Sequence, residues 1–228
     1  MKKKVFYTEL VYVFAMFIMA FSAAFTAKAD FGMSMVVAPA YILHLKLSTV
    51  FPWFSFGVSE YVFQGLLILI TILLMRRFKL SYLFSFVTAV LYGTLLDAAI
   101  LAIAPIPANG FLLRVLWYCI GVLLCSFSVS LFFHTYIAPE AYELIVKEIP
   151  LKFNVNINRV KSVYDGASMV LAVILSFACF GFGVFKGIHW GTLVCAVVNS
   201  IFIRYFSNLL EKHFEFKNKF SLEKFFND

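Results

Sequence analysis

Charge is scarce in this 228-residue sequence. Lys, Arg, Asp and Glu together make up 14% of the residues, whereas a soluble domain carries about 25%. Hydrophobic residues reach 63%, and the mean hydropathy is +0.93. The low charge excludes a soluble globular domain, and the high apolar content excludes a disordered chain. The composition therefore predicts an integral membrane protein.

Residue sets that carry catalysis or bind metals are also missing. The four cysteines lie in apolar runs without paired spacing, so neither a disulfide framework nor a zinc site is expected. Phosphate-binding loops and the motifs of zinc proteases and serine hydrolases do not occur. We therefore expect neither an enzyme nor a bound cofactor or metal. The net charge of +7 is interpreted as a set of topology signals, and no nucleic acid is expected as a partner.

Six apolar runs are long enough to cross a bilayer, which takes about 20 residues. They are Val5–Ala27, Val58–Met75, Leu80–Ala104, Phe111–Phe133, Val163–Val184 and Trp190–Leu210. The first run also resembles a signal peptide, because Lys2–Lys4 precede it and Ala27-Lys28-Ala29 follows. Its length and Glu9 favour a retained membrane helix. The sequence thus predicts an all-α, polytopic membrane protein with a single domain over residues 1–228.

Two shorter segments do not fit as complete spans. Met33–Leu45 is mostly apolar, and Pro139–Ile149 begins with a proline, which is favoured at a helix start. The second segment places apolar residues on one face and charged residues elsewhere; these are Ala141, Leu144, Ile145 and Ile149 against Glu140, Glu143, Lys147 and Glu148. Helices of this length are re-entrant or lie in the membrane interface.

The distribution of Lys and Arg predicts the orientation. Fifteen of the nineteen lie in segments that are cytoplasmic if the N-terminus is inside, and cytoplasmic loops are enriched in these residues. The other four are Lys28, Lys46, Arg114 and Lys186. We therefore expect a multi-pass protein of the bacterial cell membrane with both termini in the cytoplasm.

The order of segments repeats along the chain. A span, a short segment and two further spans occupy residues 5–104 and again residues 111–210, followed by a cytoplasmic tail over 211–228. Because each unit has three spans, the second unit is expected to be inverted relative to the first. Inverted repeats are typical of transporters, whose sites lie where short or broken helices meet. A duplicated structural bundle without transport is the alternative.

Ionisable residues inside spans are costly and usually face a bundle interior or a water-filled cavity. Glu60 and Asp165 lie early in the second and fifth spans, and Asp97 and Arg204 lie late in the third and sixth. Glu60 and Asp165 are candidates for a pathway or gate. Alternatively, each complements the dipole at a helix start, with Ser59 as a possible cap beside Glu60 and Lys161 one turn before Asp165.

Asp97 lies too deep to be an end charge, so it is a candidate for a site or for a buried pair with Arg114. Arg204 is expected to extend toward the inner interface. Gln64 and Asn199 are expected either to form hydrogen bonds across helices or to line a path.

Four short motifs resemble one bacterial family. They are Ala29-Asp30-Phe31-Gly32-Met33-Ser34 after the first span, Asn158–Asp165 at the start of the fifth, and the Gly181-Phe182-Gly183 and Gly187–Thr192 turns. These resemble the YczE/YyaS/YitT family of bacterial integral membrane proteins over about residues 5–210. The resemblance implies a multi-span bacterial membrane protein whose activity is generally unassigned.

Two functions are compatible with these features. The first is a transporter or channel-like protein for a small solute or ion. The second is a non-transporting accessory or assembly protein that acts through a partner. The expected partners are the lipid bilayer, an unidentified small solute or ion, and either a protein partner or further copies of the chain.

Overall fold

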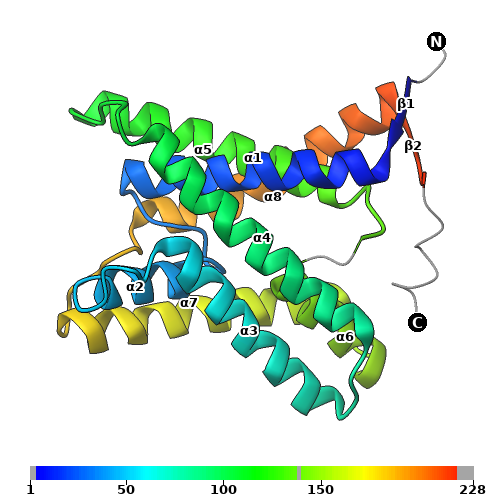
Figure 1. Cartoon of the computed structure of the whole chain (residues 1–228), viewed down its shortest axis with the longest axis horizontal. Helices are drawn as coiled ribbons and strands as arrows, with labels where there is room; N and C mark the ends of the chain where they lie inside the picture. The colour runs from blue at the N-terminus through cyan, green and yellow to red at the C-terminus, as the bar shows by residue number, and fades with distance from the viewer. Residues whose placement is uncertain (1–3, 138–139, 220–228) are drawn as a thin grey trace.

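The computed structural model describes residues 4–137 and 140–219. In this part of the chain, eight helices form a bundle and two short strands lie at its edge (Figure 1). The helices are α1 (Thr8–Ala29), α2 (Ala38–Leu47), α3 (Phe56–Met75), α4 (Leu80–Ile103), α5 (Phe111–Phe132), α6 (Ala141–Phe153), α7 (Ile157–Phe180) and α8 (Trp190–His213). The strands are β1 (Lys4–Tyr7) and β2 (Phe214–Lys217).

Six of the helices, α1, α3, α4, α5, α7 and α8, are long and apolar enough to cross a membrane. This confirms the all-α, polytopic fold expected from the sequence. α1 packs along α5 and α4, and half of its most apolar window is buried. The segment with the signal-peptide-like start is therefore an integral part of the bundle.

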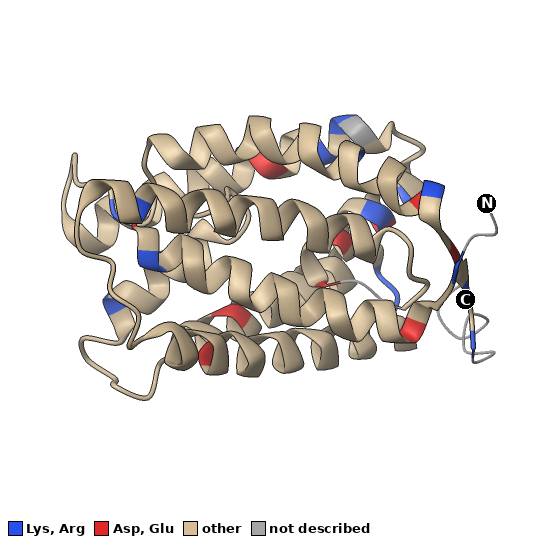
Figure 2. Ribbon diagram, turned by 90° about the horizontal axis from the view of Figure 1, so that it is seen from above, with Lys and Arg blue, Asp and Glu red and all other residues tan. Residues whose placement is uncertain are grey.

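The two chain ends meet at one end of the bundle, because β1 and β2 pair in parallel with Lys4 opposite Phe214. We call this the terminal end, and it also holds the loop between α3 and α4 (Figure 1). We call the opposite end, where α1 meets the start of α5, the far end. Lys and Arg residues gather toward these two ends (Figure 2). Lys2 and Lys3, and Lys224 of the expected tail, lie outside the described residues.

The fifth span differs from its expected bounds, Val163–Val184. α7 begins at Ile157 and ends at Phe180. The first turns of α7 are polar, so the apolar run from which the span was predicted begins after the start of the helix. Its end is set by Gly181, whose φ of +102° lies in the left-handed region that favours glycine.

The two short helices enter the bundle from opposite ends. α2 ends near the far end, where Lys46 lies over the Phe180 ring at the end of α7. α6 ends at the terminal end, where Lys152 Nζ donates to the Leu74 carbonyl at 2.6 Å. Both helices begin inside the bundle, against residues 59–64 of α3. Each therefore has the course of a re-entrant helix. The expected helix-start residue Pro139 lies outside the described residues.

The two halves of the chain are packed to different extents. α3 packs along α4, and a Cβ on Gly93 would lie 2.5 Å from the Gly57 carbonyl oxygen. Such close approach of two membrane helices requires small residues. In the described residues, α7 and α8 lack a comparable contact. Only 17% and 11% of their apolar windows is buried, against 39–50% in the other spans.

Candidate functional site

Two carboxylates meet at one buried amide in the bundle interior. Glu60 and Gln64 lie one turn apart on α3, and both side chains are fully buried. Gln64 Nε2 lies 3.4 Å from Glu60 Oε2 and 3.4 Å from Glu140 Oε2. The Tyr142 hydroxyl donates to Glu60 Oε2 at 2.8 Å. We call Glu60, Gln64, Glu140 and Tyr142 the carboxylate cluster.

The first turn of α6 is fixed by this cluster. Glu140 is the residue before α6, and the Ala141 N–H donates to Gln64 Oε1 at 3.2 Å. The start of α6 thus faces α3 inside the bundle, where the partial positive charge of a helix N-terminus stabilises a carboxylate.

The first turn of α2 lies beside the part of α3 that carries the carboxylate cluster. The Ser59 hydroxyl donates to the Ala40 carbonyl at 2.6 Å. Ala40, Phe63 and Tyr142 form one buried apolar cluster, with Tyr164 of α7 packed against it. The N-terminal ends of both short helices therefore converge on the carboxylate cluster.

Three buried oxygens at or beside this cluster have no hydrogen-bond partner in the described part of the chain. They are Glu60 Oε1, Glu140 Oε1 and the Tyr164 hydroxyl. A buried polar atom without a partner is costly, by about 1–3 kcal/mol. Burial, followed by the charges of Glu60 and Glu143, raises the pKa of Glu140 well above its ordinary value. This chemistry suits a group that binds and releases a proton.

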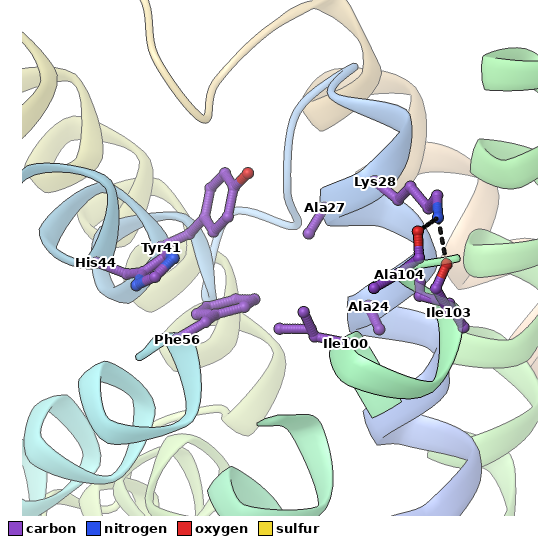
Figure 3. A pocket seen from close by; sticks show the side chains of 9 residues that line it. All are labelled: Ala24, Ala27, Lys28, Tyr41, His44, Phe56, Ile100, Ile103 and Ala104. Carbon is purple, nitrogen blue, oxygen red and sulfur yellow. Dashed lines mark hydrogen bonds between the residues drawn. The ribbon is translucent and has the colours of Figure 1, made fainter. Parts of the chain in front are cut away.

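A cavity of about 270 Å³ lies at the far end, between α1, α2, α3 and α4 (Figure 3). Its polar and aromatic lining comes from Lys28, Tyr41, His44 and Phe56, and alanine and isoleucine side chains of α1 and α4 complete the wall. Lys28 Nζ also donates to the carbonyls of Ile103 and Ala104, which end α4. Phe56 lies one turn before Glu60 on the same face of α3, so the cavity and the carboxylate cluster are one helical turn apart along this face.

Asp97 and Arg114 do not form the pair considered from the sequence. Asp97 accepts from the Gly57 N–H at 2.8 Å and from the Ser55 hydroxyl, so it caps the start of α3. The N-cap of α3 is Ser55 and not Ser59, because Ser55 Oγ accepts from the Val58 N–H at 3.1 Å.

Arg114 instead serves the end of α1. Its Nε donates to the Ala29 carbonyl at 2.8 Å, and its Nη2 lies 3.2 Å from Asp30 Oδ2. The guanidinium also lies over the Phe31 ring, 4.8 Å from its centre. Arg114 therefore satisfies exposed carbonyls at a helix C-terminus, where a cation is favourable.

The remaining candidates lie apart from the carboxylate cluster. Asp165 is partly buried about two turns into α7, and this excludes its expected role at a helix start. Lys161 on α7 and Arg204 on α8 have exposed side chains.

Asn199 connects α8 to α5. Ser126 Oγ donates to Asn199 Oδ1 at 2.7 Å, and Asn199 Nδ2 lies 3.5 Å from Cys125 Sγ. Of its two expected roles, Asn199 fulfils the hydrogen bond across helices.

A second buried carboxylate group lies at the terminal end. Glu148 is 4% exposed and accepts from Arg77 Nη2 at 3.0 Å, Lys79 Nζ at 3.1 Å and the Tyr82 hydroxyl at 3.0 Å. We call these four residues the Glu148 ion cluster. It fixes α6 to the loop between α3 and α4 and to the start of α4.

Sequence reasoning missed Glu140, Tyr142 and Glu148 as members of these clusters. Glu148 was expected away from the apolar face of its helix, which is wrong. It follows Ala141 by seven residues and Leu144 by four, and this spacing places it on the buried face. Glu140 makes no side-chain capping hydrogen bond to α6, so no local capping signal could have identified it.

Comparison with known proteins gives one match. The model of a family of unknown function, DUF6198, matches residues 6–208. No curated protein and no solved structure matches the chain. The matched family carries a different name from the one that the short motifs resemble, so that resemblance stays a prediction. Because the match covers nearly all of the membrane-spanning region, the chain belongs to the family of unknown function DUF6198.

Proposed function

We propose that this protein transports a small solute or ion across the bacterial cell membrane. The observation that carries the proposal is the convergence of two short helices, entered from opposite ends, on buried polar residues. Helix starts that meet inside a bundle are where transporters bind their substrates and coupling ions. Buried carboxylates inside a membrane bundle are costly, and they persist where they serve a pathway or a relay.

The contacts between helices support an inverted repeat of residues 5–104 and 111–210. α2 packs on α3 and α7, and α6 packs on α7 and α3, so the two short helices exchange their partners. In the same way, α4 packs on α1 and α8 packs on α5. A two-fold axis in the membrane plane between α1 and α5 would relate each of these contacts to its counterpart, although the α3–α4 contact has no comparable counterpart between α7 and α8 in the described residues.

The cavity and the two clusters suggest a route. The far-end cavity ends at Phe56, one helical turn before Glu60 on α3, and we propose that the route continues from there toward Glu60. On the other side of Glu60, the Glu148 ion cluster holds α6 against the loop between α3 and α4. We propose that the far end is extracellular, in keeping with the Lys and Arg distribution. In this proposal, the Glu148 ion cluster closes the route toward the cytoplasm.

Uptake by the purified protein in liposomes tests this proposal. A panel of small solutes and ions should contain at least one whose uptake is abolished by Glu60→Gln, because the amide keeps the shape and removes the charge. Glu211→Gln, an exposed substitution on α8, is the matched control and should leave uptake unchanged. Absence of any protein-dependent flux across the panel, or full flux in Glu60→Gln, would contradict the proposed role.

The exposed faces of α7 and α8 favour a second candidate, an accessory protein that acts through a partner. These two helices are the least buried of the six spans. Chemical cross-linking in native membranes distinguishes the candidates. An accessory protein should cross-link to a different membrane protein through cysteines at exposed positions such as Val163 and Val197, whereas a self-sufficient transporter should give only lipid contact or self-products.

A further inference from the structure

We propose that Glu60 and Glu140 form a pair that holds one exchangeable proton, positioned by Gln64 and Tyr142. The proton would be the coupling ion of the proposed transporter, and only in that respect does the inference rest on the proposed function. The step is simple: a carboxyl and a carboxylate release one proton to water and become two carboxylates, and the reverse step restores the pair.

The geometry disfavours two charges at this place. Both carboxylates lie 3.4 Å from the same Gln64 nitrogen, and Glu60 is fully buried. These two contacts place the Oε2 atoms of Glu60 and Glu140 within twice 3.4 Å of each other. Two like charges at this separation in an apolar interior repel each other strongly, so one group retains a proton. Glu60 Oε1 and Glu140 Oε1 lack partners in the described residues. Each of these atoms is therefore available to carry the retained proton.

The hydrogen-bond donors favour a proton over a metal cation. Glu60 Oε2 faces the Tyr142 O–H, and the Oε2 atoms of both glutamates face the Gln64 amide N–H groups. Donors directed at these oxygens compete with a cation for the same lone pairs. Calcium requires six to eight oxygen ligands, whereas a proton requires only the two carboxyl groups.

The surroundings allow the proton to leave. Glu140 precedes the first turn of α6, whose N–H groups stabilise the ionised form. The titratable groups that interact electrostatically with the pair are Glu143 on α6, Tyr164 on α7, Tyr92 on α4, Cys125 on α5 and Tyr12 on α1. Lys161 on α7 is an exposed cation that lies apart from the pair, and its charge opposes those of Glu143 and Asp165. The helix start therefore favours the ionised form of Glu140, whereas burial beside a second carboxylate favours the protonated form.

A hydrophobic carbodiimide is the probe, since it modifies protonated carboxyl groups in apolar sites. The protein, reconstituted in liposomes, is treated across a pH series, and mass spectrometry of its peptides quantifies the modification of Glu60 and Glu140. Modification should fall as pH rises. It should not change when sodium replaces a large organic cation at constant pH.

Substitution tests the sharing. In Glu60→Gln the second charge is gone, so the midpoint of Glu140 modification should move down by about one pH unit or more, which is the coupling expected of interacting sites. Glu211→Gln, on the exposed face of α8, should leave the midpoint unchanged. The infrared band of a protonated carboxyl group in wild-type protein gives a second measurement that needs no variant, and it should disappear over the same pH range.

Three results would overturn the shared proton. They are modification that does not depend on pH, protection by sodium at constant pH, and an unchanged Glu140 midpoint in a correctly folded Glu60→Gln protein. If the pair titrates as expected and no solute is transported, the proposed function fails and the proton site stands. If transport is found and the pair does not titrate, the proposed function stands and the proton site fails.

Discussion

Glu148 shows what a buried carboxylate does when its charge is matched. Burial acts to raise the pKa of Glu148, but hydrogen bonds from Lys79, Arg77 and Tyr82 outweigh it and hold the pKa below its usual range. Glu140 has the opposite balance, because burial and neighbouring acids raise its pKa. Glu140 and Glu148, which lie only eight residues apart, therefore have opposite pKa shifts. We interpret Glu148 as structural and Glu140 as a group that exchanges a proton.

A pH series of thermal melts in detergent tests the role of Glu148. Because its pKa is lower in the folded state, its stabilisation is full above the ordinary glutamate pKa of about 4.3 and is lost as pH falls through the folded-state pKa. Glu148→Gln should lower the free energy of unfolding by about 1–3 kcal/mol near neutral pH. The variant and the wild type should converge in acid.

The matched control for this prediction is Glu143→Gln on the same helix. Burial raises the pKa of Glu143, so its stabilising contribution is present at low pH and is lost as pH rises. This variant should be at least as stable as the wild type near neutral pH. A difference between Glu148→Gln and wild type that does not change with pH would show that the ion cluster is not the cause.

At the scale of elements, the packing of α3 on α4 depends on one backbone contact. The two helices approach so closely at Gly57 and Gly93 that a Cβ on either would meet the other's carbonyl oxygen. Asp97 strengthens the same contact, because it lies one turn after Gly93 and caps the start of α3. This crossing holds the α3 face that carries Glu60 in position against α6.

Gly93→Ala tests the crossing. The added methyl group would lie 2.5 Å from the Gly57 carbonyl oxygen, so the helices must separate at a cost of about 1–3 kcal/mol. Gly166→Ala in α7 is the control, because a Cβ there meets nothing within 4 Å. Since alanine favours a helix over glycine by about 1 kcal/mol, this variant should be as stable as the wild type or more stable. Equal melting temperatures for the two variants would refute the close crossing.

At the scale of the whole molecule, the parallel pairing of β1 with β2 brings the chain ends together at the terminal end. This arrangement requires an even number of spans, in agreement with the six long apolar helices. From the Lys and Arg distribution we infer that the terminal end is cytoplasmic.

Labelling of single cysteines in intact cells tests this orientation. After replacement of the native cysteines, Asn109→Cys at the far end should react with a membrane-impermeant maleimide. Phe78→Cys, in the loop between α3 and α4 and 64% exposed, should react only after the cells are permeabilised. The reverse pattern would invert the orientation. Reaction of both in intact cells would contradict α4 as a membrane span, since α4 is the helix between these two positions.

The sequence by itself determined the all-α membrane fold, the positions of six spans and the two short helices. These features are local, because the length and polarity of a segment decide whether it crosses a bilayer, and each can be read without knowing its neighbours. The sequence also identified Glu60 and Gln64 as costly polar residues in a span. The start of α7 was misplaced because polar helical turns extend beyond the apolar run.

Only the tertiary structure decided which polar groups meet. Glu60 and Glu140 are far apart in the chain, and the packing of α6 on α3 brings both to the Gln64 amide. The same packing assigned Asp97 to the start of α3 and Arg114 to the end of α1, although either residue could have paired with the other. The reason is physical: the partner of a buried charge depends on how helices dock, and docking depends on contacts such as Gly57 on Gly93, which no local pattern specifies.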